Sequence, residues 1–115
     1  MIKKNEEMKV NYIEHMRGGA GTAIRKDILG SDDMAKHSRL FSMFTLKKGC
    51  GIGEHEHKNE TEYYYIISGK GIVTEKDGEK VALPGDVVIT GDGESHAIRN
   101  DEDEDLVFVA VIILD

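Results

Sequence analysis

The sequence lacks the features that identify several classes of protein. Its 115 residues include one cysteine, Cys50, and one proline, Pro84. No apolar run approaches the roughly 20 residues that a membrane-spanning helix needs. A single cysteine excludes an intrachain disulfide, which suits a reducing compartment. The first ten residues contain lysines but no apolar segment typical of a secretory signal. We therefore expect a cytoplasmic protein with no membrane partner.

Basic residues are also in the minority. The chain has 22 acidic and 15 basic residues, and its formal net charge is −7 at pH 7. Nucleic-acid binding depends mainly on basic side chains, so no nucleic-acid partner is expected. Residues of the hydrophobic types make up 39% of the chain, enough for one core. The length and this composition predict a single domain over residues 1–115.

What the sequence has in abundance is short β-type segments. Eight of them are rich in β-branched and aromatic residues and are bounded by Gly, Asp, Asn or Pro. Asp77-Gly78 carries a hairpin signal between two of them, and thirteen glycines suit tight reversals. The predicted strands are Thr22–Leu29, Arg39–Leu46, Tyr63–Ile67, Gly71–Glu75, Glu79–Leu83, Val87–Thr90, Ser95–Arg99 and Leu106–Leu114. Many short strands at close spacing predict an all-β sandwich or barrel.

Three other segments are less regular. Asn5–Met16 has mixed polar and apolar spacing, and Ser31–His37 begins with possible capping residues, but a helix is not favoured in either. The acidic run Asp101–Asp105 is interpreted as a solvated loop between two strands, in preference to a cation site.

The stretch Gly53–Tyr65, GEHEHKNETEYYY, concentrates histidine and glutamate. In a strand, the alternation of side chains places His55 and His57 on one face, whereas helical spacing would separate them. After a turn at residues 58–60, a strand over Thr61–Ile67 places Glu62 opposite the histidines. A further histidine, His96, lies in the predicted strand Ser95–Arg99.

Two spaced motifs contain these residues. Gly49–Gly69 has the pattern G-x5-H-x-H-x4-E-x6-G, and Gly85–Asn100 has the pattern G-x5-G-x-G-x2-H-x3-N. The pair resembles the two conserved motifs of the cupin superfamily. The first motif matches at every fixed position. The second departs once, since Gly91 stands where a proline is usual, which loosens that turn without affecting a ligand.

The resemblance implies an all-β, double-stranded β-helix, which is a jelly-roll β-barrel. It also implies a metal ion held by His55, His57, Glu62 and His96. Three imidazoles and one carboxylate suit one divalent transition metal such as Mn, Fe, Ni or Zn, with manganese favoured. They do not suit calcium or magnesium, which prefer oxygen ligands. Four protein ligands leave up to two positions open on an octahedral ion.

Other residues near the motif are given other roles. Glu54, Glu56 and Glu60 are expected to be exposed charges, His15 and His37 surface residues, and Cys50 not a ligand. Strand parity predicts that Tyr63 and Tyr65 point outward and that Tyr64 points inward. For Tyr64, a place in the core is favoured over a place in the pocket wall.

Several functions remain open at this point. The resemblance favours a metal-binding barrel that acts on or binds a small carboxylate such as oxalate. As an enzyme it would be a metal-dependent decarboxylase, dioxygenase or isomerase, with no catalytic residue assigned. The alternative is a non-catalytic module that binds a small sugar or acid at the same site. In a third interpretation the metal is purely structural, so that its removal would unfold the protein.

The segment Leu106–Leu114, LVFVAVIIL, is apolar on both faces. A strand with one face in water should alternate apolar and polar residues, so something is expected to cover its outer face. The N-terminal segment, with Val10, Tyr12, Ile13 and Met16, is one candidate. A second subunit is the favoured one, because cupins commonly pair in this way, and a homodimer is predicted.

Overall fold

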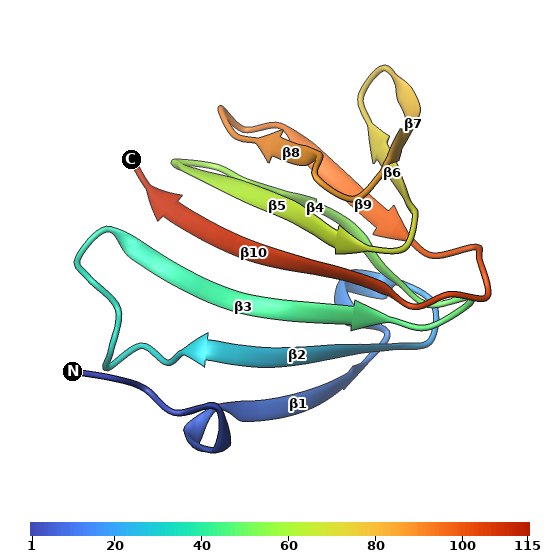
Figure 1. The fold of residues 1–115 in the computed structure, drawn as a ribbon. Coiled ribbons are helices and arrows are strands. Elements are labelled where there is room, and N and C mark those ends of the chain that lie inside the picture. Colours follow the sequence, from blue (N-terminus) through green and yellow to red (C-terminus); the bar gives the residue numbers. More distant parts are fainter.

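The computed structural model describes residues 1–115 and is built from two antiparallel β-sheets (Figure 1). A six-stranded sheet has the order β1-β2-β3-β10-β5-β8, and a four-stranded sheet has the order β4-β9-β6-β7. The strands are β1 (Lys9–Glu14), β2 (Thr22–Leu29), β3 (Ser38–Leu46), β4 (Gly51–Glu56), β5 (Glu60–Ser68), β6 (Gly71–Glu75), β7 (Gly78–Ala82), β8 (Val87–Thr90), β9 (Ser95–Arg99) and β10 (Leu106–Leu114). This arrangement confirms the predicted all-β fold of jelly-roll type.

All eight predicted strands are present, with small differences at their ends. The segment Asn5–Met16 contains a short 3-10 turn, η1 (Asn5–Glu7), followed by β1. Strand β1 forms because it pairs with β2 along its length. The spacing of residues within the segment gives no sign of this pairing. Ser31–His37 forms turns and no helix. No helix in the structure has the length and apolar character needed to cross a membrane.

The core lies between the two sheets. Phe44 of β3 and Phe108 of β10 stack with their ring centroids 5.3 Å apart, and Tyr64 of β5 lies 4.5 Å from Phe108. Ile52 and Ile98 close the core from the four-stranded sheet. Burying a side chain of this size stabilises the fold by about 1.5–3 kcal/mol. Every second side chain of β5, Tyr64 among them, points inward, and so do the functional residues of this strand described below.

Asn100, the last residue of the second motif, fixes the loop between β9 and β10. Its Nδ2 donates to the carbonyl oxygens of Leu46 and Glu104, each at 2.9 Å, and its Oδ1 accepts from the Glu102 backbone N–H. The acidic run that follows is largely exposed, as predicted for a solvated loop.

Strand β10 is central in the six-stranded sheet, between β3 and β5. Its inward residues Phe108, Ala110 and Ile112 are buried, whereas the alternate residues face the outer side of the sheet. The N-terminal segment does not cover that side, because β1 pairs with β2 at the edge of the same sheet. Of the two candidates for covering the outer face of β10, the N-terminal segment is therefore excluded.

Candidate metal centre

Four side chains from both sheets converge inside the barrel. His55 lies on β4, His57 directly follows β4, Glu62 lies on β5, and His96 lies on β9. One possible ligand atom from each of the four lies within 4.8 Å of the others. Strand alternation explains the placement, because Glu54 and Glu56 point outward while His55 and His57 point inward. The structure thus brings together all four residues of the predicted set.

The positions of the histidines depend on a close backbone approach. The 3-10 turn η2 (Met16–Gly18) and the following Gly19 pack directly against β4. A Cβ on Gly53 would lie 2.8 Å from the backbone nitrogen of Gly19, a distance that real Cβ atoms do not adopt. Glycine at both positions therefore lets η2 lie against the strand that carries His55.

The outer nitrogen of each imidazole is held by a hydrogen bond. His55 Nδ1 donates to the Gly53 carbonyl oxygen at 2.7 Å, and His57 Nδ1 donates to Glu60 Oε2 at 2.6 Å. His96 Nδ1 is hydrogen-bonded to Thr90 Oγ1 at 2.7 Å. A carbonyl or carboxylate oxygen can only accept, so these bonds place the proton of His55 and His57 on Nδ1. The Nε2 atoms of His55 and His57 are then each left with a lone pair that is free to bind a cation.

The Nε2 atoms are close to one another and to Glu62. His96 Nε2 lies 3.0 Å from His55 Nε2, 3.1 Å from His57 Nε2 and 3.0 Å from Glu62 Oε1. His57 Nε2 lies 2.9 Å from the same oxygen. Adjacent ligands of an octahedral ion with bonds of about 2.1 Å lie about 3.0 Å apart, so the spacing suits such an ion. Three imidazole nitrogens and a carboxylate oxygen that converge at this spacing are the donor set of a cation site.

The pKa values show the same electrostatic bias. Burial opposes the charge of Glu62, but the three histidines beside its carboxylate hold the pKa of that group well below its ordinary value. Burial likewise opposes the positive charge of His57, yet the neighbouring carboxylates of Glu62 and Glu60 hold its pKa above the ordinary 6.5. Burial lowers the pKa of His96. The centre therefore carries a carboxylate that attracts positive charge.

Glu60 is not the exposed charge that the sequence predicted. Only 7% of it is exposed, and its carboxylate accepts two hydrogen bonds of 2.7 Å from Arg39 as well as the bond from His57. The prediction was wrong because β5 begins at Glu60, which gives this residue the inward parity of Glu62. The parity of Glu60 with Glu62 was the signal that could have revealed it.

Tyr64 connects the centre to the core. Its ring stacks on His96 with centroids 4.8 Å apart, and it also packs on Phe108. Burial, together with the negative charge of Glu62, raises the pKa of Tyr64 well above its ordinary value, so the hydroxyl stays protonated. The favoured prediction of a core residue is confirmed, and the same side chain also lines the pocket at the centre.

The remaining sequence candidates lie outside the cluster. His15 and His37 are exposed, as are Glu54 and Glu56, in agreement with the predictions. Cys50 is half-buried and does not belong to the group of converging ligands.

A small cavity of about 130 Å³ adjoins the cluster and is bordered by His55, His57 and Glu62. It is smaller than the ~300–1,000 Å³ typical of pockets for drug-sized ligands. Its wall also includes three arginines that the sequence analysis did not single out, Arg17, Arg25 and Arg39. They come from η2, β2 and β3, so no spacing along the chain connects them with the histidines. Two of them are paired with carboxylates, Arg25 with Asp27 and Arg39 with Glu60, so Arg17 is the one unpaired cationic side chain of this wall.

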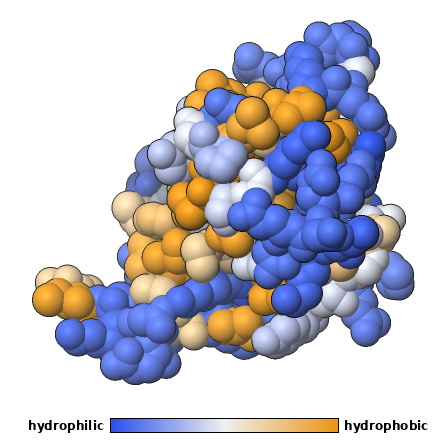
Figure 2. Space-filling model, turned by 45° about the vertical axis from the view of Figure 1, so that its right-hand side comes forward, coloured by the Kyte–Doolittle hydropathy of each residue, from blue (hydrophilic) through white to orange (hydrophobic).

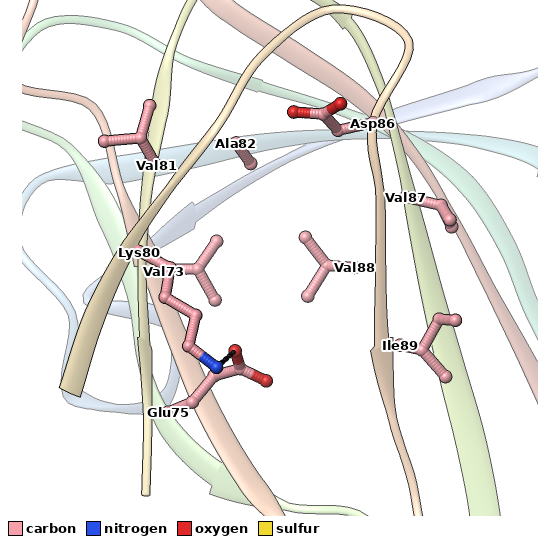
Figure 3. A pocket seen from close by; sticks show the side chains of 9 residues that line it. All are labelled: Val73, Glu75, Lys80, Val81, Ala82, Asp86, Val87, Val88 and Ile89. Carbon is pink, nitrogen blue, oxygen red and sulfur yellow. Dashed lines mark ion pairs between the residues drawn. The ribbon is translucent and has the colours of Figure 1, made fainter. Parts of the chain in front are cut away.

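A second cavity of about 290 Å³ lies between the free edges of β7 and β8 (Figure 3). Val73 and Val88 point toward each other across it, and Lys80 pairs with Glu75 at 3.1 Å. Its lining is mainly apolar and includes none of the four converging residues. It therefore belongs to a different part of the barrel.

Comparisons with known proteins agree with this geometry. A family model described as the Cupin domain matches residues 42–112. The oxalate-binding protein of Thermotoga maritima is 38% identical over 114 residues, which cover 99% of this chain and 94% of that protein. A crystal structure from Thermotoga maritima, described as a predicted oxalate decarboxylase, is 37% identical, covers 100% of both chains and gives a TM-score of 0.93.

A more distant structure, a polyketide cyclase from Streptomyces resistomycificus, is 17% identical. It covers 100% of this chain and 81% of its own chain, with a TM-score of 0.81, and this similarity concerns the fold alone. Both sequence motifs, Gly49–Gly69 and Gly85–Asn100, lie entirely within the matched residues 42–112. The chain belongs to the cupin family.

Proposed function

We propose that this protein binds one divalent transition metal through His55, His57, Glu62 and His96 and uses it to bind a small dicarboxylate such as oxalate. The observation that carries the proposal is the convergence of four ligand atoms beside a small cavity with arginines in its wall. The relative of Thermotoga maritima that is named an oxalate-binding protein supports the same ligand class.

The donor set selects the kind of metal. Three imidazoles and one carboxylate suit Mn, Fe, Ni or Zn, and manganese is the first choice because the remaining positions would be filled by carboxylate oxygens. When bound, the ion would supply a positive charge that polarises a ligand carboxylate. The chain itself contributes the orientation of the imidazoles, the exclusion of water by Tyr64, and the cationic pocket wall.

Binding is favoured over turnover as the role of the site. Decarboxylation needs a proton donor near the metal. Glu62 is the one acidic residue in the wall of the cavity, and it is the proposed metal ligand. Glu60 is held by Arg39 and His57, while Glu54 and Glu56 face solvent. A metal-dependent decarboxylase, dioxygenase or isomerase is the second candidate.

Calorimetry tests this function. Protein loaded with manganese should bind one oxalate per chain, and the double variant His55→Ala/His57→Ala should bind neither manganese nor oxalate. Formate should not appear during prolonged incubation with oxalate. Oxalate binding that survives in the double variant would contradict the proposal, and release of formate would support the enzyme in its place.

Glu60 should contribute to metal affinity through His57. A hydrogen bond that a metal-binding histidine donates to a second carboxylate typically contributes 10–100-fold in metal affinity. We therefore expect Glu60→Gln to weaken manganese binding by about tenfold or more. Glu56→Gln removes an exposed charge of the same type four residues away and should change the affinity less than about twofold. Equal affinities for the two variants would show that the Glu60–His57 bond does not orient a ligand.

Metal affinity should also depend on pH. The pKa of His57 is held above 6.5, so protons begin to compete with the metal above that pH as the solution is acidified. Glu62 stays ionised because its pKa is held far below neutrality. Below the pKa of His57, affinity should fall by about tenfold per pH unit for each proton displaced, and it should level off at higher pH. Titrations with a competing chelator measure this, and a flat profile through the histidine range would contradict imidazole ligation.

We also propose that the outer face of the six-stranded sheet joins two copies of the chain. The register aligns Met43, Val109, Tyr65 and Val87 in one row across β3, β10, β5 and β8. Phe41, Val111, Tyr63 and Ile89 form a second row. Neither row contains a charged residue. Figure 2 shows hydrophobic residues gathered in a band beside a strongly hydrophilic region.

The occupant of this face should be a second copy. Tyr65 is 51% exposed and Ile89 58%, although both are large apolar side chains. Aromatic residues are enriched at protein interfaces. The part of this face formed by β3, β10, β5 and β8 has no charged residue in the two rows, which limits repulsion between two chains of net charge −7, and the adjoining charge in the first row is that of Lys26 on β2. Two-fold pairing of the same face on itself is the commonest symmetry of homo-oligomers.

Light scattering tests the dimer. The wild-type protein should have twice the mass of the 12.8 kDa chain. Tyr65→Glu buries a charge at the centre of the contact and should shift the protein to the mass of one chain at the same concentration. Lys76→Gln alters the net charge by the same amount at an exposed turn and should leave the dimer intact. A wild-type protein of single-chain mass would contradict the proposal.

The proposal also covers the cellular compartment of the protein and the number of its domains. Cys50 is a free thiol. Thiols persist in the reducing cytoplasm, where we place the protein. The shared core of both sheets supports one domain over residues 1–115.

A further inference from the structure

The η2 turn holds Arg17 in an unusual backbone conformation. Its φ and ψ angles are 54° and 29°, in the left-handed region, and His15 two residues earlier has a φ of 51°. Residues with a Cβ seldom adopt this region because the side chain crowds the backbone. Such conformations persist where the surrounding structure enforces them, and they are concentrated at functional sites.

The surroundings of η2 enforce this conformation. The backbone of η2 and Gly19 lies against Gly51 and Gly53 of β4, with no room for a Cβ on Gly19 or on Gly53. Two residues after Gly53, the same strand presents His55 to the metal centre. The close contact therefore fixes Arg17 relative to the proposed metal ligands.

Arg17 is also the arginine of the cavity wall without a protein partner. Arg25 pairs with Asp27 at 2.8 Å, and Arg39 pairs with Glu60 at 2.7 Å. Arg17 takes part in no ion pair and no side-chain hydrogen bond in the structure. Its charge acts on Tyr64, where it lowers the pKa against the larger raising effects of burial and of Glu62. Arg17 is thus an exposed arginine without a protein partner in the wall of the cavity that His55, His57 and Glu62 also line.

From the strained backbone, the glycine contact and the unpaired charge, we propose that Arg17 binds the carboxylate of a dicarboxylate ligand that points away from the metal. This inference rests on the proposed metal and oxalate binding. Arginine suits the role because its planar guanidinium can donate two parallel hydrogen bonds to one carboxylate. Arg17 then determines specificity, since a ligand with one carboxylate gains nothing from it.

Two ligands and four proteins test the role. Oxalate is compared with glycolate, which has the same two-carbon length and can also reach the metal but has only one carboxylate. Both are titrated by calorimetry into manganese-loaded wild type, Arg17→Gly, Arg17→Gln and Arg99→Gln. Arg99 lies outside the cavity on β9, and its replacement changes the net charge by the same amount.

In Arg17→Gly, oxalate affinity should fall about tenfold or more, which is the usual size of a lost charge-assisted hydrogen bond. Glycolate affinity should change less than about twofold, and Arg99→Gln should match wild type for both ligands. The melting temperature of metal-free Arg17→Gly should not be lower than that of wild type, because glycine adopts a φ of 54° without strain. Arg17→Gln, which retains the Cβ, should lose oxalate affinity equally.

The outcomes separate this inference from the function on which it rests. Oxalate affinity that is unchanged in both Arg17 variants would overturn the role of Arg17 and leave the metal and oxalate site standing. An equal loss for oxalate and glycolate would overturn its selectivity for a second carboxylate. Manganese-loaded wild type that binds no oxalate would overturn both proposals.

Discussion

The structure places three imidazole nitrogens and a carboxylate oxygen 2.9–3.6 Å apart, over the distances that it records, in a space almost closed to solvent. Buried polar atoms this close together need a proton or a cation between them to be stable. Much of the surrounding structure serves this arrangement. Gly53, Glu60 and Thr90 hold the outer nitrogens of the three rings, and the glycines of β4 let η2 close over the strand.

The centre also connects the two sheets. Glu62 belongs to the six-stranded sheet, whereas His55 and His96 belong to the four-stranded sheet. A series of stacked rings runs from His96 through Tyr64 to Phe108 in the core. A metal bound by ligands from both sheets would therefore stabilise the native state by linking them, in proportion to its affinity and concentration. Ligand binding and folding would be thermodynamically linked in this barrel.

The sequence was most informative where the functional residues follow the alternation of side chains along a strand. The spacing of His55 and His57, the parity of Glu62 and the motif around His96 were enough to assemble the candidate site. Turn residues and β-branched segments likewise located eight strands. What escaped prediction depends on contacts between distant strands. The ion pair of Arg39 with Glu60 joins β3 to β5, and Arg17 reaches the cavity through a turn fixed by glycines elsewhere. Strand β1 was missed because its pairing with β2, not its own pattern, determines its conformation.

Anomalous diffraction at the manganese absorption edge, from crystals grown with manganese, tests the central claim most directly. The account predicts one anomalous peak per chain, about 2.0–2.3 Å from the Nε2 atoms of His55, His57 and His96 and from a carboxylate oxygen of Glu62. A peak confined to the acidic loop Asp101–Asp105, with no density between the three histidines, would contradict it.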